Sequence, residues 1–93
     1  MEIVFSKLAS LELEDAIAFY ETELAGLGFR FKEEIKSSIF RIKEHPEAWS
    51  IEKGEVRKVL LHRFPYKILY AIEKEKIIIL AIAHQHRKPN HWL

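Results

Sequence analysis

Histidine and arginine side chains gather near the end of the chain. His84, His86 and His91 fall within eight residues, and Arg87 and Lys88 lie between them. Histidine has the side chain whose unperturbed pKa lies nearest neutrality, so it can act as a general acid or base. Arginine presents a fork that matches phosphate oxygens. Together these groups suit phosphodiester chemistry, in which protons move to and from oxygen while a cation stabilises the developing charge.

Two other interpretations of the histidines stay open. His84 and His86 share one face of an extended segment, so with His91 they could bind zinc. No cysteine, HExxH motif or neighbouring acidic residue supports such a site. His84 could also be a strand-end residue whose ring bonds a backbone carbonyl. We predict no metal and no cofactor, because the sequence has no glycine-rich phosphate loop either.

A second group of basic and aromatic residues precedes this tail. Arg57 and Arg63 lie six positions apart, so on one strand they would share a face and present it to a partner. Charge at an edge strand that guards against aggregation is the alternative. Tyr66 could stack on a base or pack in the core, and Tyr70 suits the core better.

The charge of the chain is split between its two parts. Residues 1–52 carry a net charge of −5 and residues 53–93 one of +6, within a total of +1. Such a basic segment steers anionic partners, although a helical half with a solvated acidic face would give the same split. The absence of cysteine excludes disulfides and thiol nucleophiles and favours a reducing cytoplasm. No stretch is long enough to cross a membrane, and the N-terminus lacks the features of a signal peptide.

Hydrophobic periodicity predicts one α+β domain over residues 1–93. Apolar residues at helical spacing indicate two helices, with Leu13, Ile17, Tyr20 and Leu24 on the first and Phe31, Ile35, Ile39 and Ile42 on the second. Ser6 or Ser10 can cap the first helix, and Pro46 ends the second. Strands are predicted at 2–5, 55–61, 66–72 and 76–84. We therefore expect an N-terminal strand and an antiparallel helical hairpin packed on an antiparallel sheet, with the last strand central.

Several segments resemble RelE/ParE-type toxins of bacterial type II toxin–antitoxin systems. They include the helix stop at His45-Pro46 and four C-terminal stretches: Val56-Arg57-Lys58, Arg63 to Tyr70, Ile79 to His84, and Arg87-Lys88-Pro89 with Trp92. The resemblance implies the same two-helix and sheet fold. It also implies a hetero-oligomer with a cognate antitoxin, whose C-terminal segment masks the toxin, and growth arrest when the antitoxin is degraded.

The resemblance implies two possible targets. RelE-like members cleave mRNA on the ribosome with a basic sheet face, whereas ParE-like members poison DNA gyrase and are not nucleases. The sequence lacks the lysine-rich active-site strand and terminal tyrosine of some RelE members. A degenerate toxin that only binds its antitoxin is the remaining alternative. For the nuclease, the catalytic candidates are His84, His86 and Arg57; the candidates for binding the target are Arg63, Tyr66, Lys67, Arg87 and Lys88.

Overall fold

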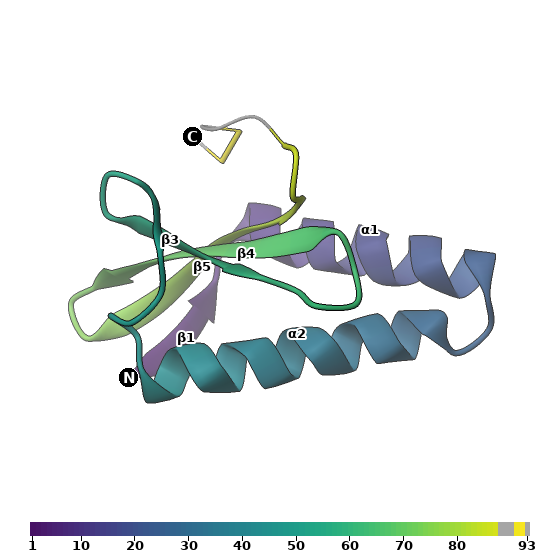
Figure 1. Cartoon of the computed structure of the whole chain (residues 1–93), viewed down its shortest axis with the longest axis horizontal. Helices are drawn as coiled ribbons and strands as arrows, with labels where there is room; N and C mark the ends of the chain where they lie inside the picture. Colours follow the sequence, from purple (N-terminus) through teal and green to yellow (C-terminus); the bar gives the residue numbers. More distant parts are fainter. Residues whose placement is uncertain (88–90, 93) are drawn as a thin grey trace.

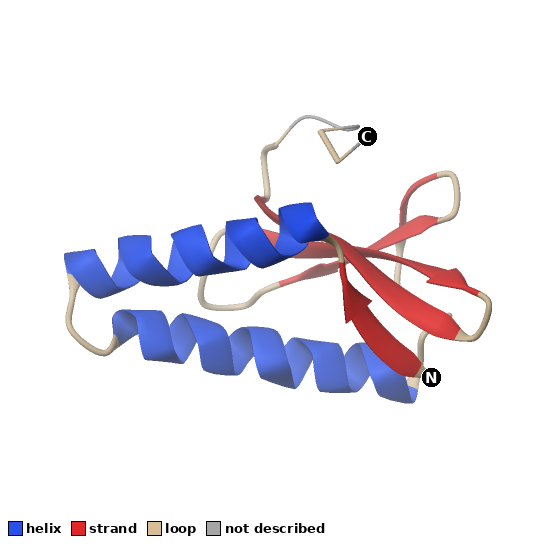
Figure 2. Ribbon diagram, turned by 180° about the vertical axis from the view of Figure 1, so that it is seen from behind, coloured by secondary structure: helices blue, strands red, loops and turns tan. Residues whose placement is uncertain are grey.

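Two long helices and one five-stranded sheet make up the protein (Figure 1). The computed structural model describes residues 1–87, 91 and 92. The helices are α1 (Lys7–Glu23) and α2 (Leu27–Glu44). The strands are β1 (Glu2–Phe5), β2 (Ile51–Lys53), β3 (Val56–Leu60), β4 (Tyr66–Glu73) and β5 (Lys76–His84). The helical hairpin packs against the sheet and its tip projects beyond it, as the view from behind also shows (Figure 2).

Local hydrogen bonds fix where the helices begin and turn. Of the two serines that could cap α1, Ser6 does so: its hydroxyl accepts a bond from the Ala9 amide at 3.0 Å. Gly26 joins the helices with a left-handed φ of 88°. Gly28 lets α2 lie close to α1, because a Cβ there would lie 2.6 Å from the Ile17 carbonyl oxygen. The predicted antiparallel hairpin is therefore confirmed.

The strand order of the sheet is β1-β5-β4-β3-β2. As predicted, β3, β4 and β5 are antiparallel neighbours and β5 is an interior strand. Two features differ from the predicted antiparallel sheet. The N-terminal strand β1 pairs with β5 in parallel, which makes the sheet mixed, and β2 adds a strand at the far edge. Periodicity missed β2 because three residues are too few to establish an alternation.

The core lies between the helices and one face of the sheet. Side chains of α2 fill it from one side, and alternate residues of β3, β4 and β5 meet them: Phe31, Ile35, Ile42, Val59, Ile68, Tyr70, Ile77, Ile79 and Ile82. Tyr70 is fully buried, and its hydroxyl donates to the Pro46 carbonyl at 2.5 Å. Burial raises the pKa of Tyr70 to about 12. The prediction that Tyr70 packs in the core is confirmed. Among the described residues, no helix is both long and apolar enough to cross a bilayer.

Candidate functional site

Four of the predicted site residues meet at one end of the sheet. Tyr66 stands opposite His84 in the β4–β5 register, and their ring centroids lie 5.8 Å apart. The His84 and His86 rings lie 5.5 Å apart, and Arg87 lines the same 330 Å³ pocket as Tyr66 and His84. We call Tyr66, His84, His86 and Arg87 the end-of-sheet cluster. Its three charged or ionisable tail residues are all exposed.

Carboxylates from α1 border the end-of-sheet cluster. Glu12 and Asp15 line its pocket, and burial together with the charge of Glu12 raises the pKa of Tyr66. The Glu12 carboxylate accepts a bond from the Ile82 amide at 2.8 Å and lies 3.2 Å from Nε2 of His91. These acidic groups make the pocket less favourable for a phosphate than the sequence suggested. The described part of the chain contains no cluster of three metal-binding side chains.

Arg57 lies apart from the histidines. Its guanidinium donates to the Trp49 carbonyl at 2.6 Å. Arg57 pairs with Tyr70, which is four residues along β4 from Tyr66, so it lies about 13 Å from the end-of-sheet cluster. The structure thus does not bring the three predicted catalytic residues together. The prediction that Arg57 and Arg63 share a strand face is wrong, because β3 ends at Leu60 and Arg63 belongs to the following loop.

Lys67 forms an ion pair within the protein. It is only 5% exposed, and its Nζ lies 2.9 Å from Oε2 of Glu52, while Nζ of Lys58 lies 3.5 Å from Oε1 of the same carboxylate. The hydrogen bond from Lys67 holds the pKa of Glu52 below its usual value. Lys67 was predicted to bind the target; in this structure it is buried and its ammonium is paired with Glu52. Lys88, another predicted contact, lies outside the described residues.

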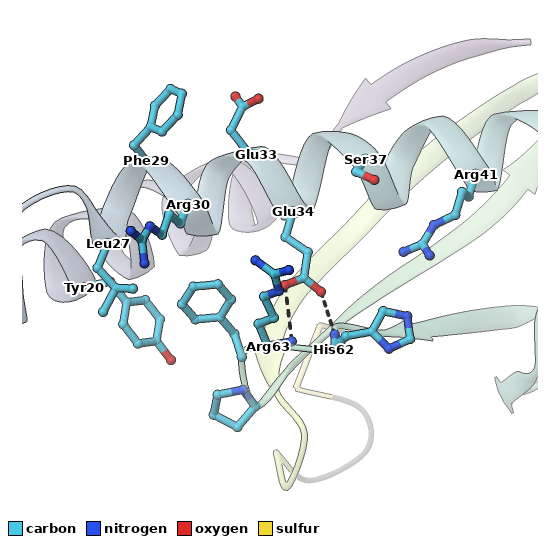
Figure 3. A pocket seen from close by; sticks show the side chains of 12 residues that line it. Tyr20, Leu27, Phe29, Arg30, Glu33, Glu34, Ser37, Arg41, His62 and Arg63 are labelled. Carbon is cyan, nitrogen blue, oxygen red and sulfur yellow. Dashed lines mark hydrogen bonds between the residues drawn. The ribbon is translucent and has the colours of Figure 1, made fainter.

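A large groove lies between α2 and the loop from Leu61 to Pro65 (Figure 3). Its volume is about 720 Å³. We call it the arginine groove, because Arg30 and Arg41 of α2 and Arg63 of the loop line it beside apolar walls of Tyr20, Leu27, Phe29, Phe64 and Pro65. Figure 3 shows Arg30 and Arg41 pointing from α2 toward the loop, and Arg63 extending from the loop toward α2.

One glutamate of α2 fixes the loop that forms the far wall. The Glu34 carboxylate accepts bonds from the backbone amides of His62 at 2.5 Å and Arg63 at 3.2 Å (Figure 3). Arg41 is partly buried, and it donates to Ser38 Oγ at 3.1 Å and lies 6.0 Å from the Trp49 ring. Arg30 and Arg63 are exposed. The groove therefore presents two accessible guanidinium groups beside an aromatic wall.

The sequence analysis identified Arg63 but missed the residues of α2 that line the same groove. Arg30, Glu34 and Arg41 are spaced by four and seven residues, which places them on one flank of a helix. That spacing was a usable signal. The signal is easily overlooked because a charged flank of a helix usually faces only solvent. No local pattern indicates that a loop 28 to 29 residues after Glu34 packs beside this flank.

The architecture defines the class of protein. A strand, a helical hairpin and four further strands in one mixed sheet form the RelE/ParE-like α+β fold. A solved structure described as the chromosomal ParDE TA system from P. aeruginosa superposes with a TM-score of 0.80, over 90% of this chain and 95% of that chain. Sequence identity between the two is 17%, so this likeness concerns the fold.

Sequence comparison then gives the family. Residues 3–89 match the profile of the ParE toxin of the type II toxin–antitoxin system, parDE. The chain therefore belongs to the ParE toxin family. This confirms the resemblance drawn from the C-terminal stretches. A search of the curated proteins finds no match.

Proposed function

We propose that this ParE-type toxin arrests growth by binding and inhibiting DNA gyrase, without covalent chemistry of its own, and that a cognate antitoxin neutralises it in the cytoplasm. The observation that carries the proposal is the separation of the nuclease candidates. Proton transfer requires groups within hydrogen-bond reach of the reacting atoms. Arg57 instead bonds the Trp49 carbonyl and lies about 13 Å along the sheet from His84.

The charge distribution supports the same proposal. A sheet face that binds RNA needs cations free to meet phosphates. Here Glu52 lies within 4 Å of the ammonium groups of Lys58 and Lys67, and Glu12 and Asp15 border the histidines. The basic excess of residues 53–93 is therefore partly compensated inside the fold rather than displayed along the sheet.

The arginine groove supplies a surface suited to a protein target. Arginine and aromatic residues are enriched at the centres of protein interfaces, where they contribute most of the binding energy. Arg30 and Arg63 are exposed, and Phe29 beside them is 65% exposed. We assign this groove to gyrase binding.

The test is to express the toxin without antitoxin and to examine plasmid topology and mRNA in the same cells. The proposal predicts growth arrest with altered plasmid supercoiling and with mRNA that gives full-length primer extension products. Cleaved mRNA with normal plasmid topology would overturn the gyrase assignment. Unchanged growth would instead favour a degenerate toxin that only binds its antitoxin.

Ribosome-dependent mRNA cleavage is the second candidate. One observation favours it: Tyr66, His84 and Arg87 line a single pocket, so that a base-stacking ring, a proton-transfer group and a cation lie together. It requires that Arg57 be dispensable. Primer extension on translated mRNA tests it, because cleavage would have to disappear in His84→Ala and persist in Arg57→Ala.

A further inference from the structure

The two ends of the arginine groove differ in chemistry. At one end Arg30 lies beside the apolar and aromatic side chains of the lining, which are Tyr20, Leu27, Phe29, Phe64 and Pro65. The rings of Tyr20 and Phe64 pack there with centroids 4.8 Å apart. At the other end the lining is polar and consists of Ser37, Arg41 and His62 (Figure 3). We call them the apolar end and the polar end.

The distance between the two ends suits a short segment of another chain. Arg30 and Arg41 are eleven residues apart on α2, which is a rise of about 16 Å along the helix. Arg63 lies between them, because its amide donates to the Glu34 carboxylate at 3.2 Å. An extended peptide covers this distance with about five residues. One segment of that length can therefore contact both ends of the groove.

The charge of the groove that has no partner is positive. Two glutamates line it, but the Glu34 carboxylate accepts bonds from two backbone amides, and Glu33 lies 3.6 Å from Lys36. Both carboxylates therefore have partners. By contrast, none of the ion pairs found among residues 1–87, 91 and 92 involves an arginine. An acidic partner would match the three arginines of the groove.

The guanidinium of Arg41 is only partly bonded within the fold. It donates to Ser38 Oγ at 3.1 Å, but its buried Nε has no acceptor among the described residues. A buried donor without an acceptor is unfavourable. A carboxylate accepts two parallel hydrogen bonds from one guanidinium. If Arg41 turns toward a carboxylate in the groove, it therefore exchanges one hydrogen bond for two stronger ones.

We propose that the arginine groove binds an acidic segment of gyrase. A carboxylate of that segment binds Arg41 at the polar end, and an apolar side chain packs against the apolar end beside Arg30. The inference deepens the proposed function and rests on it, since that function supplies gyrase as the partner. It makes Arg41 a residue that determines which segment binds, in addition to the exposed Arg30 and Arg63.

The same features disfavour a nucleic acid as the occupant. Phosphates bind to cations and hydrogen-bond donors, so a nucleic acid backbone would leave the apolar end uncovered. It would also bring phosphates close to Glu33 and Glu34, which line the groove. A peptide with both a carboxylate and an apolar side chain matches the two ends.

The first test measures binding of the toxin to purified gyrase holoenzyme in the absence of DNA. Ser37→Glu adds a negative charge at an exposed position of the polar end and should weaken binding on the order of 10-fold. Arg41→Gln should weaken it to a similar extent. Lys36→Gln makes the same change in net charge on the opposite flank of α2, and it should change the affinity less than about 3-fold.

The second test identifies the group that binds at the polar end. A carbodiimide joins an amine directly to a carboxylate that lies beside it, but it does not couple a guanidinium. In Arg41→Lys the new amine should therefore be joined to an aspartate or glutamate of gyrase, which peptide mass spectrometry of the complex locates. Ser37→Lys places an amine one turn away and leaves the bond between Arg41 and Ser38 intact, so it gives the same test if Arg41→Lys does not fold.

The outcomes separate this inference from the proposed function. If the wild-type toxin binds gyrase but neither lysine variant is joined to a gyrase carboxylate, the inference is wrong while the proposed function stands. The inference is also wrong if Ser37→Glu binds as tightly as the wild type. Binding that requires DNA, with no product at position 41 or 37, would assign the groove to a nucleic acid and overturn the inference. Failure of the wild-type toxin to bind gyrase under any of these conditions would instead refute the proposed function.

Discussion

The two flanks of α2 carry the same sign of charge in two different side chains. The arginine groove places Arg30 and Arg63 against aromatic walls and faces a loop that Glu34 holds in place. The other flank, the lysine flank, places Lys32 and Lys36 beside apolar residues of β1, the outermost strand of the described sheet. One helix thus separates an arginine surface from a lysine surface.

Charge alone therefore does not define a binding surface in this fold. Arginine offers a planar fork that stacks on aromatic rings and suits the centre of an interface, whereas lysine is a hydrated point charge that suits a rim. The arginine groove is therefore the surface proposed for gyrase, and the lysine flank of α2 is its internal control.

The largest effect is expected from the double substitution Arg30→Gln/Arg63→Gln. It removes both exposed guanidinium groups of the arginine groove but keeps the backbone amide through which residue 63 bonds Glu34. Growth arrest should require on the order of 100-fold more toxin, because a contribution of about 1.4 kcal/mol from each of the two arginines to the interface is a factor of ten each. Colony counts against induction level measure this. Arg30→Lys/Arg63→Lys, which keeps the charge, should recover only part of the activity, and full recovery would mean that the fork is irrelevant.

The next effect concerns the loop behind the arginine groove. Glu34→Ala leaves two backbone amides without their carboxylate and should lower the free energy of unfolding by about 1–3 kcal/mol. Glu33→Ala is the matched control, because this neighbour makes only an exposed pair with Lys36 and should cost at most about 0.5 kcal/mol. Denaturant titration measures both. Similar losses in the two variants would show that Glu34 does not anchor the loop.

Part of this fold could be predicted from the sequence alone. The helices, the three long strands and the buried Tyr70 followed from periodicity, because a face that repeats over many residues must meet the core. The parallel pairing of β1 could not be read locally, since it joins residues more than seventy positions apart. For the same reason, the ion pair of Lys67 with Glu52 and the hydrogen bond from Arg57 to the Trp49 carbonyl could not be predicted, because no local pattern specifies where Glu52 and Trp49 lie.

A smaller effect should follow from acidification. Lys67 keeps the pKa of Glu52 low in the folded protein, so the folded state binds fewer protons than the unfolded state below pH 5. The stability that this pair contributes is present above the unfolded pKa of about 4.3 and is lost as the pH falls through the folded pKa. Unfolding free energies at a series of pH values should show this loss. In Lys67→Met the loss should be smaller, and growth arrest should persist, since Lys67 is buried beside Glu52. The same pH dependence of the unfolding free energy in Lys67→Met and in the wild type would contradict this role of the pair.

The smallest effect is expected at the end-of-sheet cluster. His84→Ala/His86→Ala should leave growth arrest unchanged, because the gyrase account gives these histidines no proton to transfer. Both side chains are exposed, so the fold should tolerate the change. The variant is assayed by the same colony counts as the arginine variants. A loss of toxicity as large as theirs would support the nuclease alternative.

The most direct test of the account is supercoiling of relaxed plasmid by purified DNA gyrase in the presence of purified toxin. The account predicts that the wild-type toxin and Lys32→Glu/Lys36→Glu inhibit supercoiling at similar concentrations, whereas Arg30→Gln/Arg63→Gln requires on the order of 100-fold more. Normal supercoiling at every concentration of the wild-type toxin would contradict the gyrase assignment. Equal inhibition by all three proteins would contradict the proposal that the arginine flank of α2, and not the lysine flank, binds gyrase.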